Sequence, residues 1–143
     1  MSAARSLTRI GAIAGTLSAA LMLAVTQASA ATAETERATA TTHSSGVSWD
    51  KCVATSSNQA CFSPTGDWFS VYDGNSDGSS AVVDWEAGSR YGAIFNADGY
   101  GANRFKNKDF TEGVTVRFRV CKGHWSTKLI TAGTCSGWVS ISA

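Results

Sequence analysis

The chain of 143 residues lacks the features that would assign it to a membrane, to nucleic acid or to a helical fold. After one apolar stretch near the N-terminus, no second long apolar run follows that would anchor the product in a membrane. The 12 Lys and Arg nearly balance the 11 Asp and Glu, which excludes a global field that attracts nucleic acid or anionic lipid. No window shows a sustained helical spacing of apolar residues, so we expect little helix.

The one long apolar run has the layout of a secretory signal peptide. Arg5 and Arg9 precede an apolar stretch over residues 10–25, and small residues then form a cleavage site. We therefore predict a signal peptide over residues 1–30 and a secreted mature protein that begins near Ala31 in an oxidising, extracellular environment. Because both arginines leave with the signal peptide, the mature chain is slightly acidic.

All four cysteines follow the predicted cleavage site, and an even count in a short exported chain indicates disulfides. Three connectivities are open from sequence alone. We favour Cys52–Cys61 and Cys121–Cys135, because each pair closes a short loop between expected strands, a closure that stabilises by about 3 kcal/mol in the chain-entropy model. The spacings do not fit the usual patterns of zinc ligands.

Residues 31–46 are small and polar, and we predict a flexible leader because such a segment cannot bury enough surface to offset its chain entropy. The first large apolar side chains after it are Val47 and Trp49. The predicted domain therefore covers residues 47–143, a length that suits a single domain with one core.

Within this domain apolar residues alternate with period two, as in half-buried strands. The pattern places Val83 and Trp85 on one face and Asp84 on the other, and Gly88-Ser89 predicts a hairpin turn. The expected strands cover residues 67–72, 81–86, 91–95, 114–120 and 138–141. Short strands, 14 glycines and one proline predict an all-β fold, a small disulfide-stapled antiparallel β-sandwich.

One loop has the spacing of a calcium site. Its candidate ligands are Asp73, Asn75, Asp77, the carbonyl of Ser79, and Asp84 at the twelfth position. Against calcium, Asp84 is shorter than the glutamate expected there, Ala81 supplies no ligand, and Asp-Gly pairs are common in ordinary turns. Calcium is therefore the only cofactor considered, and a solvated hairpin loop remains the alternative.

No catalytic set emerges from the remaining motifs. The G-x-S-x-G sequence at residues 74–78 lies between expected strands rather than at a strand-to-helix turn, and His124 has no partner that would activate a nucleophile. Asp84 and Glu86 share one strand face, which is typical of a solvated face. We expect no enzymatic activity.

Several aromatic residues are candidates for binding. Trp85, Trp138 and either Trp68 or Phe69 fall within expected strands and are assigned to the core. Trp49, Tyr100 and Trp125 lie near strand ends or loops, where they would stack on sugar rings or fill a partner's pocket; capping of the small core is the alternative.

The order of short motifs along the domain resembles a group of small secreted β-rich proteins of high-GC Gram-positive bacteria, which generally have no assigned function. The resemblance is carried by residues 60–62, 66–67, 71–73, 77–78, 80–83, 112–113 and 118–121, with Trp85, Asn96, Gly99, Gly101, Cys135 and Ser136. It implies export and a β fold, and no catalytic residue. Many proteins of this group carry a further cysteine pair near residues 92–107, where this chain has Ile94 and Lys106.

These observations predict a secreted, monomeric, non-catalytic binding domain for an extracellular protein or glycan. Nucleic acid and, after signal cleavage, membranes are not expected partners. The alternative is an inhibitor of a secreted protease or glycosidase, because a rigid loop closed by Cys52–Cys61 would be preorganised for that role.

Overall fold

The computed structural model describes residues 31–143, and this part of the chain folds as two β-sheets. The predicted signal peptide, residues 1–30, lies outside the described residues. Every regular element of the described part is a strand, and it has no helix of the length and apolarity needed to span a membrane. The prediction of an all-β, sandwich-like fold with two disulfides is confirmed.

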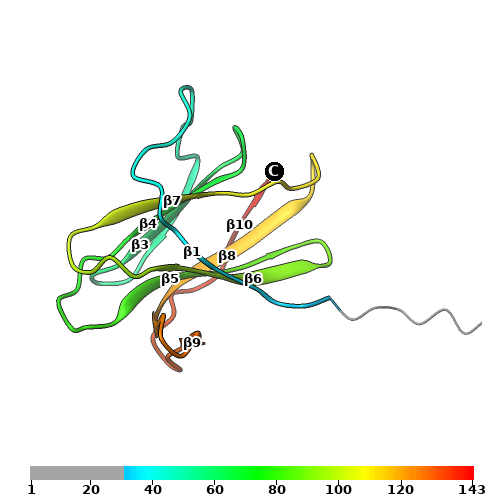
Figure 1. Ribbon diagram of the computed structural model, residues 1–143. Coiled ribbons are helices and arrows are strands. Elements are labelled where there is room, and N and C mark those ends of the chain that lie inside the picture. The colour runs from blue at the N-terminus through cyan, green and yellow to red at the C-terminus, as the bar shows by residue number, and fades with distance from the viewer. Residues whose placement is uncertain (1–30) are drawn as a thin grey trace, which may run out of the picture.

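The two sheets form the two layers of the molecule (Figure 1). The six-stranded sheet has the order β1 (Glu34–Arg37), β6 (Arg90–Asn96), β5 (Ser80–Ala87), β8 (Thr115–His124), β10 (Val139–Ser142), with β9 (Leu129–Ile130) beside β8. The four-stranded sheet has the order β2 (Lys51–Ala54), β3 (Gln59–Ser63), β4 (Trp68–Tyr72), β7 (Asn103–Asn107). All pairings are antiparallel except β1 with β6.

The core lies between the sheets and is built from their inward-facing alternate residues. Trp85 and Phe118 of the six-stranded sheet are fully buried, as the alternation predicted, and so are Phe62 and Phe69 of the four-stranded sheet. The Phe69 and Phe118 rings meet across the interface with centroids 5.5 Å apart. Burying several aromatic side chains in this way is the main stabilisation available to so small a domain.

A second, smaller core lies on the opposite side of the six-stranded sheet. Val82, Phe95 and Cys121 are fully buried there, although their positions alternate with those of the main core. The loop closed by the Cys121–Cys135 disulfide covers them. The other disulfide, Cys52–Cys61, joins directly opposed residues of β2 and β3.

Residues 34–40 belong to the fold, so the prediction of a flexible leader over residues 31–46 is wrong. β1 pairs in parallel with β6, where Glu34 lies opposite Gly92, and Ala38 is fully buried. A Cβ at Gly92 would lie 2.1 Å from the Glu34 carbonyl oxygen, so the close approach of β1 requires glycine there.

The physical reason for this docking is a network of ion pairs that apolar periodicity does not reveal. Glu34 accepts hydrogen bonds from Nε of Arg90 at 2.8 Å and from Nζ of Lys108 at 2.6 Å, and Lys108 also pairs with Glu36. The Lys108 side chain is only 4% exposed, and its Nζ lies 4.7 Å from the centroid of the Trp85 ring. The hydrogen bonds from Arg90 and Lys108 lower the pKa of Glu34 to about 2, so the carboxylate is ionised at neutral pH.

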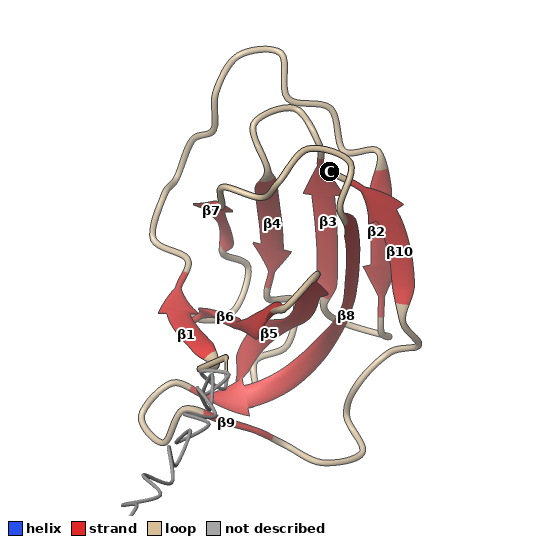
Figure 2. Cartoon of the chain, turned by 90° about the vertical axis from the view of Figure 1, so that its right-hand side faces the viewer, coloured by secondary structure: helices blue, strands red, loops and turns tan. Residues whose placement is uncertain are grey.

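After β1 the chain passes from one sheet to the other. Ala40 forms an antiparallel bridge with Phe105 of β7, and residues 41–50 then run to β2 at the opposite edge of the four-stranded sheet (Figure 2). We call residues 41–50 the strap. It brings a predicted binding residue, Trp49, to this sheet.

Candidate functional site

The outer face of the four-stranded sheet carries aromatic and amide side chains. Phe69 and Val71 of β4 are fully buried, so strand alternation turns Trp68, Ser70 and Tyr72 outward. The register places outward-facing residues of β3 and β7 beside them. We call this surface the aromatic face; it consists of Gln59, Trp68, Tyr72, Asn103, Phe105 and Asn107, together with Cys61, Ser63 and Ser70, which face the same way but are buried.

No side chain of the aromatic face is charged. The two cations of β7, Arg104 and Lys106, alternate with its outward residues and pair instead with Asp98 and Glu36. The face therefore presents aromatic rings together with neutral hydrogen-bonding groups. Such a surface offers no electrostatic attraction to a charged ligand of either sign, so it suits a neutral ligand.

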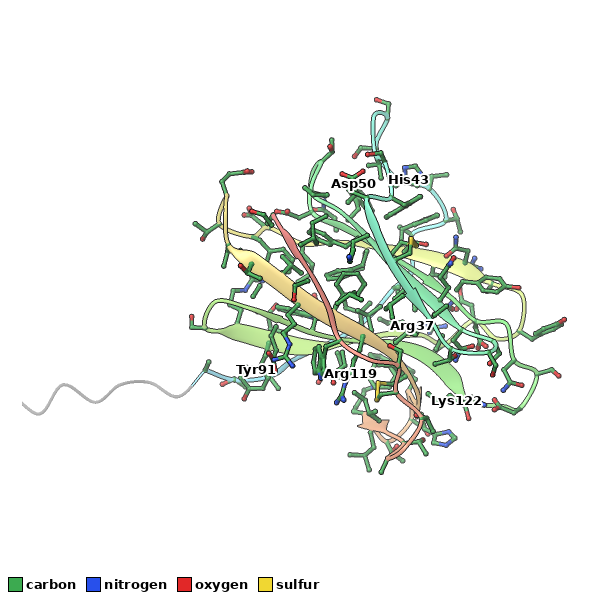
Figure 3. All side chains as sticks on the ribbon, turned by 180° about the vertical axis from the view of Figure 1, so that it is seen from behind. Arg37, His43, Asp50, Tyr91, Arg119 and Lys122 are labelled. Carbon is green, nitrogen blue, oxygen red and sulfur yellow. A yellow bond between two sulfur atoms is a disulfide. The ribbon has the colours of Figure 1, made fainter. Side chains whose placement is uncertain are left out.

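The strap adds two aromatic rings to this face. The indole of Trp49 stacks on the ring of Phe105, with centroids 5.7 Å apart and planes 9° from parallel, and His43 meets both rings edge-on. Figure 3 shows His43 and Asp50 close together at one end of the molecule, far from Arg119 and Lys122. The structure thus places the predicted residue Trp49 at the aromatic face.

The neutral hydrogen-bonding groups are held by the sheet. Ser70 Oγ donates to Asn103 Oδ1 at 2.9 Å, and the Asn107 amide donates to the Gly66 carbonyl. Tyr72 is 37% exposed beside them. Because these groups are fixed on paired strands before binding, they lose little conformational entropy when a ligand binds.

The structure does not bring the other two predicted aromatic residues to this face. Trp125 lies over the second core, where its ring centroid is 5.7 Å from that of Phe95. Tyr100 is 68% exposed in the loop between β6 and β7. Trp49, Tyr100 and Trp125 therefore do not form one patch.

The outer face of the six-stranded sheet is charged instead. Asp84 pairs with Arg119 at 2.8 Å and Glu86 with Arg117 at 3.2 Å, and both guanidinium groups lie about 4.5 Å over the Trp138 ring. The assignment of Trp138 to the core is wrong, because its ring lies among these outward-facing arginines. Asp84 and Glu86 each form an ion pair with an arginine and do not interact with each other as a pair of carboxylates.

The structure brings four of the five predicted calcium ligands together and leaves the fifth apart. Hydrogen bonds within one turn connect Asp73, Asn75, Asp77 and Ser79. The carboxylate of Asp77 also accepts from the ammonium of Lys122 at 2.7 Å, whereas Asp84 lies farther along β5 on the charged face. Among residues 31–143 no three His, Cys, Asp or Glu side chains are grouped so that they could hold a metal ion.

Comparison of the chain with models of known protein families, with curated proteins and with solved structures found no match. The structure defines the class: a small all-β domain of two sheets, stapled by two disulfides.

Proposed function

We propose that the chain is an exported, monomeric, non-catalytic domain that binds neutral glycans through the aromatic face. The observation that carries the proposal is the composition of this face, where the rings of Trp68 and Tyr72 and the Trp49 indole stacked on Phe105 lie beside the amides of Gln59, Asn103 and Asn107, with no charged side chain among the outward residues of the paired strands. Export is supported by the N-terminal sequence pattern and by two disulfides, which persist outside the cell.

The chemistry of a neutral sugar matches this surface. One side of a pyranose ring presents C–H groups, which lie favourably against the electron-rich face of an aromatic ring. The hydroxyl groups at its rim need donors and acceptors, which Asn103, Asn107 and Gln59 supply. Protein interfaces are also enriched in aromatic residues, but they commonly add arginine, and the aromatic face has no arginine among its outward residues.

Calcium is not required for this proposal. Lys122 already provides the positive charge beside Asp77, and Asp84 is engaged by Arg119. A weak calcium site in the turn of Asp73 and Asn75 would stabilise a neighbouring loop without changing the composition of the aromatic face.

The test is a binding panel of neutral polysaccharides: cellulose, xylan, chitin and amylose. We expect the exported protein to be retained by at least one of them. We expect Trp68→Ala and Phe105→Ala to weaken this retention at least tenfold, while Trp138→Ala, which removes a half-buried tryptophan from the opposite sheet, leaves it unchanged. Melting temperatures of all variants control for folding.

Two results would reject the proposal. One is the absence of binding to every neutral polysaccharide of the panel, and the other is binding that Trp68→Ala and Phe105→Ala do not reduce. If the panel fails but the protein inhibits a secreted protease or glycosidase, the inhibitor hypothesis based on the Cys52–Cys61 hairpin replaces it.

A further inference from the structure

A cleft lies between the two loops that follow β4 and β6. Its volume is about 280 Å³. The first loop contributes Asn75, Ser76 and Ser79 to its lining. The second loop contributes Ala97, Gly99 and Tyr100. The volume lies just below the range of about 300–1,000 Å³ that is typical of pockets for drug-sized ligands, so it suits a single ring rather than a chain.

The lining of this cleft is neutral, although both loops contain acids. Asp77 is paired with Lys122, and Asp98 is paired with Arg37 and Arg104. These pairings lower the pKa of both carboxyl groups. The cleft itself is left with amide, hydroxyl and aromatic groups.

Two other cavities of the molecule have a different character. The cavity of about 460 Å³ at the turn between β5 and β6 is lined by Arg90 and Glu112, and that of about 260 Å³ beside β1 is lined by Asp84 and Lys128. Charged lining residues make both less suitable for a neutral sugar. The cleft between the loops shares the neutral composition of the aromatic face.

The two loops that line the cleft adjoin strands of the aromatic face in sequence and are hydrogen-bonded to each other there. Asp73, which begins the first loop, directly follows Tyr72, and its N–H donates to the carbonyl of Ala102 at 3.0 Å. The Gly101 N–H donates back to the Asp73 carbonyl at 2.7 Å. Ala102 in turn directly precedes Asn103, which lies opposite Tyr72. The two loops are therefore joined where the face ends.

The loops are held before any ligand arrives. The buried side chain of Asn96 donates to the carbonyls of Val71 and Ala102, each at 2.8 Å, and its Oδ1 accepts from the Asp98 N–H. Asn75 N–H donates to the buried carboxyl of Asp73 at 3.1 Å. A preformed cleft loses less conformational entropy when it is filled.

We propose that this cleft is a subsite for one neutral sugar residue at the end of a glycan that lies along the aromatic face. The proposal rests on the proposed function, because the glycan reaches the cleft over Tyr72 and Asn103. Tyr100 is the stacking residue of the subsite, and Asn75 and Ser79 supply hydrogen bonds to the sugar hydroxyls.

The experiment compares binding of a hexasaccharide of the retained polysaccharide by wild type, Tyr100→Ala and Ser76→Leu. The first variant removes the stacking ring, and the second fills the cleft from an exposed position. We expect each to weaken the affinity about fivefold to tenfold without lowering Tm. Tyr91→Ala, which removes an exposed tyrosine of the other sheet, is the matched control and should leave the affinity unchanged.

Amide chemical shifts during the same titration locate the sugar. Shifts at residues 75–80 and 97–100 together with those of β4 and β7 support the subsite. Shifts confined to β3, β4 and β7, with unchanged affinity for Tyr100→Ala and Ser76→Leu, overturn it while the proposed function stands. Absence of binding by wild type rejects the proposed function and the subsite with it.

Discussion

The Trp49 indole stacks on Phe105 with ring centroids 5.7 Å apart and planes 9° from parallel. This contact joins the strap to β7, although 56 residues separate the two in the chain. It places a second aromatic layer on the charge-free face of the four-stranded sheet. The pair thus links the stability of the strap to the surface that we propose for glycan binding.

Replacing Trp49 by alanine tests this link. We expect Trp49→Ala to lower the free energy of unfolding by about 1–3 kcal/mol, because a half-buried ring loses both its burial and its stacking partner. Denaturant unfolding measures the change. Trp49→Phe retains a stacking ring and should recover most of the loss; equal losses for the two variants would show that the stack does not hold the strap.

Gly92→Ala tests the docking of β1. The added Cβ would lie 2.1 Å from the carbonyl oxygen of Glu34, so β1 has to move away from β6. We expect a destabilisation of about 1–3 kcal/mol and faster amide exchange at residues 34–38. Gly137→Ala is the control, since nothing lies within 4 Å of its added Cβ. Unchanged exchange in Gly92→Ala would contradict the described pairing.

Acid should release β1 before the rest of the fold. The pKa of Glu34 is about 2 in the folded protein against an ordinary value of 4.5. Because the folded value is the lower one, the stabilisation is complete above pH 4.5 and is lost as the pH falls from 4.5 toward 2. Amide exchange of residues 34–37, corrected for its intrinsic pH dependence, measures this loss.

Glu34→Gln is the matched control for the acid experiment. It keeps an oxygen that accepts a hydrogen bond from Arg90 but removes the charge. We expect weaker docking of β1 at pH 6 and little further change down to pH 3. If wild type and Glu34→Gln show the same pH dependence, other carboxyl groups control β1.

Asp67→Asn should stabilise the protein at neutral pH. Asp67 has φ of 54°, a conformation that asparagine also tolerates, and its Oδ2 accepts from the Phe110 N–H at 2.8 Å. Burial, with smaller contributions from Glu112 and Asp109, raises the pKa of this carboxyl, so its charge destabilises the native state as the pH rises through the folded pKa.

We expect Tm of Asp67→Asn to exceed that of wild type by a few degrees at pH 7, the range for a change of about 1 kcal/mol. The difference should shrink toward pH 3. A lower Tm at pH 7 would show that the neutral amide cannot replace the carboxylate beside Phe110.

Local sequence patterns predicted the all-β class and the strands β4, β5, β6, β8 and β10, but not β1, β2, β3, β7 and β9. The Cys52–Cys61 disulfide joins neighbouring strands, and strand alternation alone assigns the burial of Trp85. β1 was missed because its partner strand is more than fifty residues away and its docking depends on ion pairs and on Gly92 rather than on apolar side chains. Parallel pairing at a sheet edge leaves no short-range signal.

The candidate site could be predicted only in part, for the same reason. Trp49 stands out in the sequence as an aromatic residue shortly before Cys52, the first cysteine of the chain. Its partner Phe105 and the neighbouring Trp68 are brought together by the register of β4 with β7, which the sequence alone does not specify. Trp125 has a similar local context but covers the second core, because the Cys121–Cys135 loop folds back over Phe95.

The central claim is that the charge-free face binds a neutral glycan, and calorimetric titration with the retained hexasaccharide at 50 mM and at 500 mM salt tests it most directly. A neutral ligand on an uncharged surface gains nothing from long-range charge, so screening should leave its affinity unchanged. We predict saturable binding that is equal at both salt concentrations and at least tenfold weaker for Trp68→Ala. Binding that falls steeply with salt, or that Trp68→Ala leaves intact, would contradict the account.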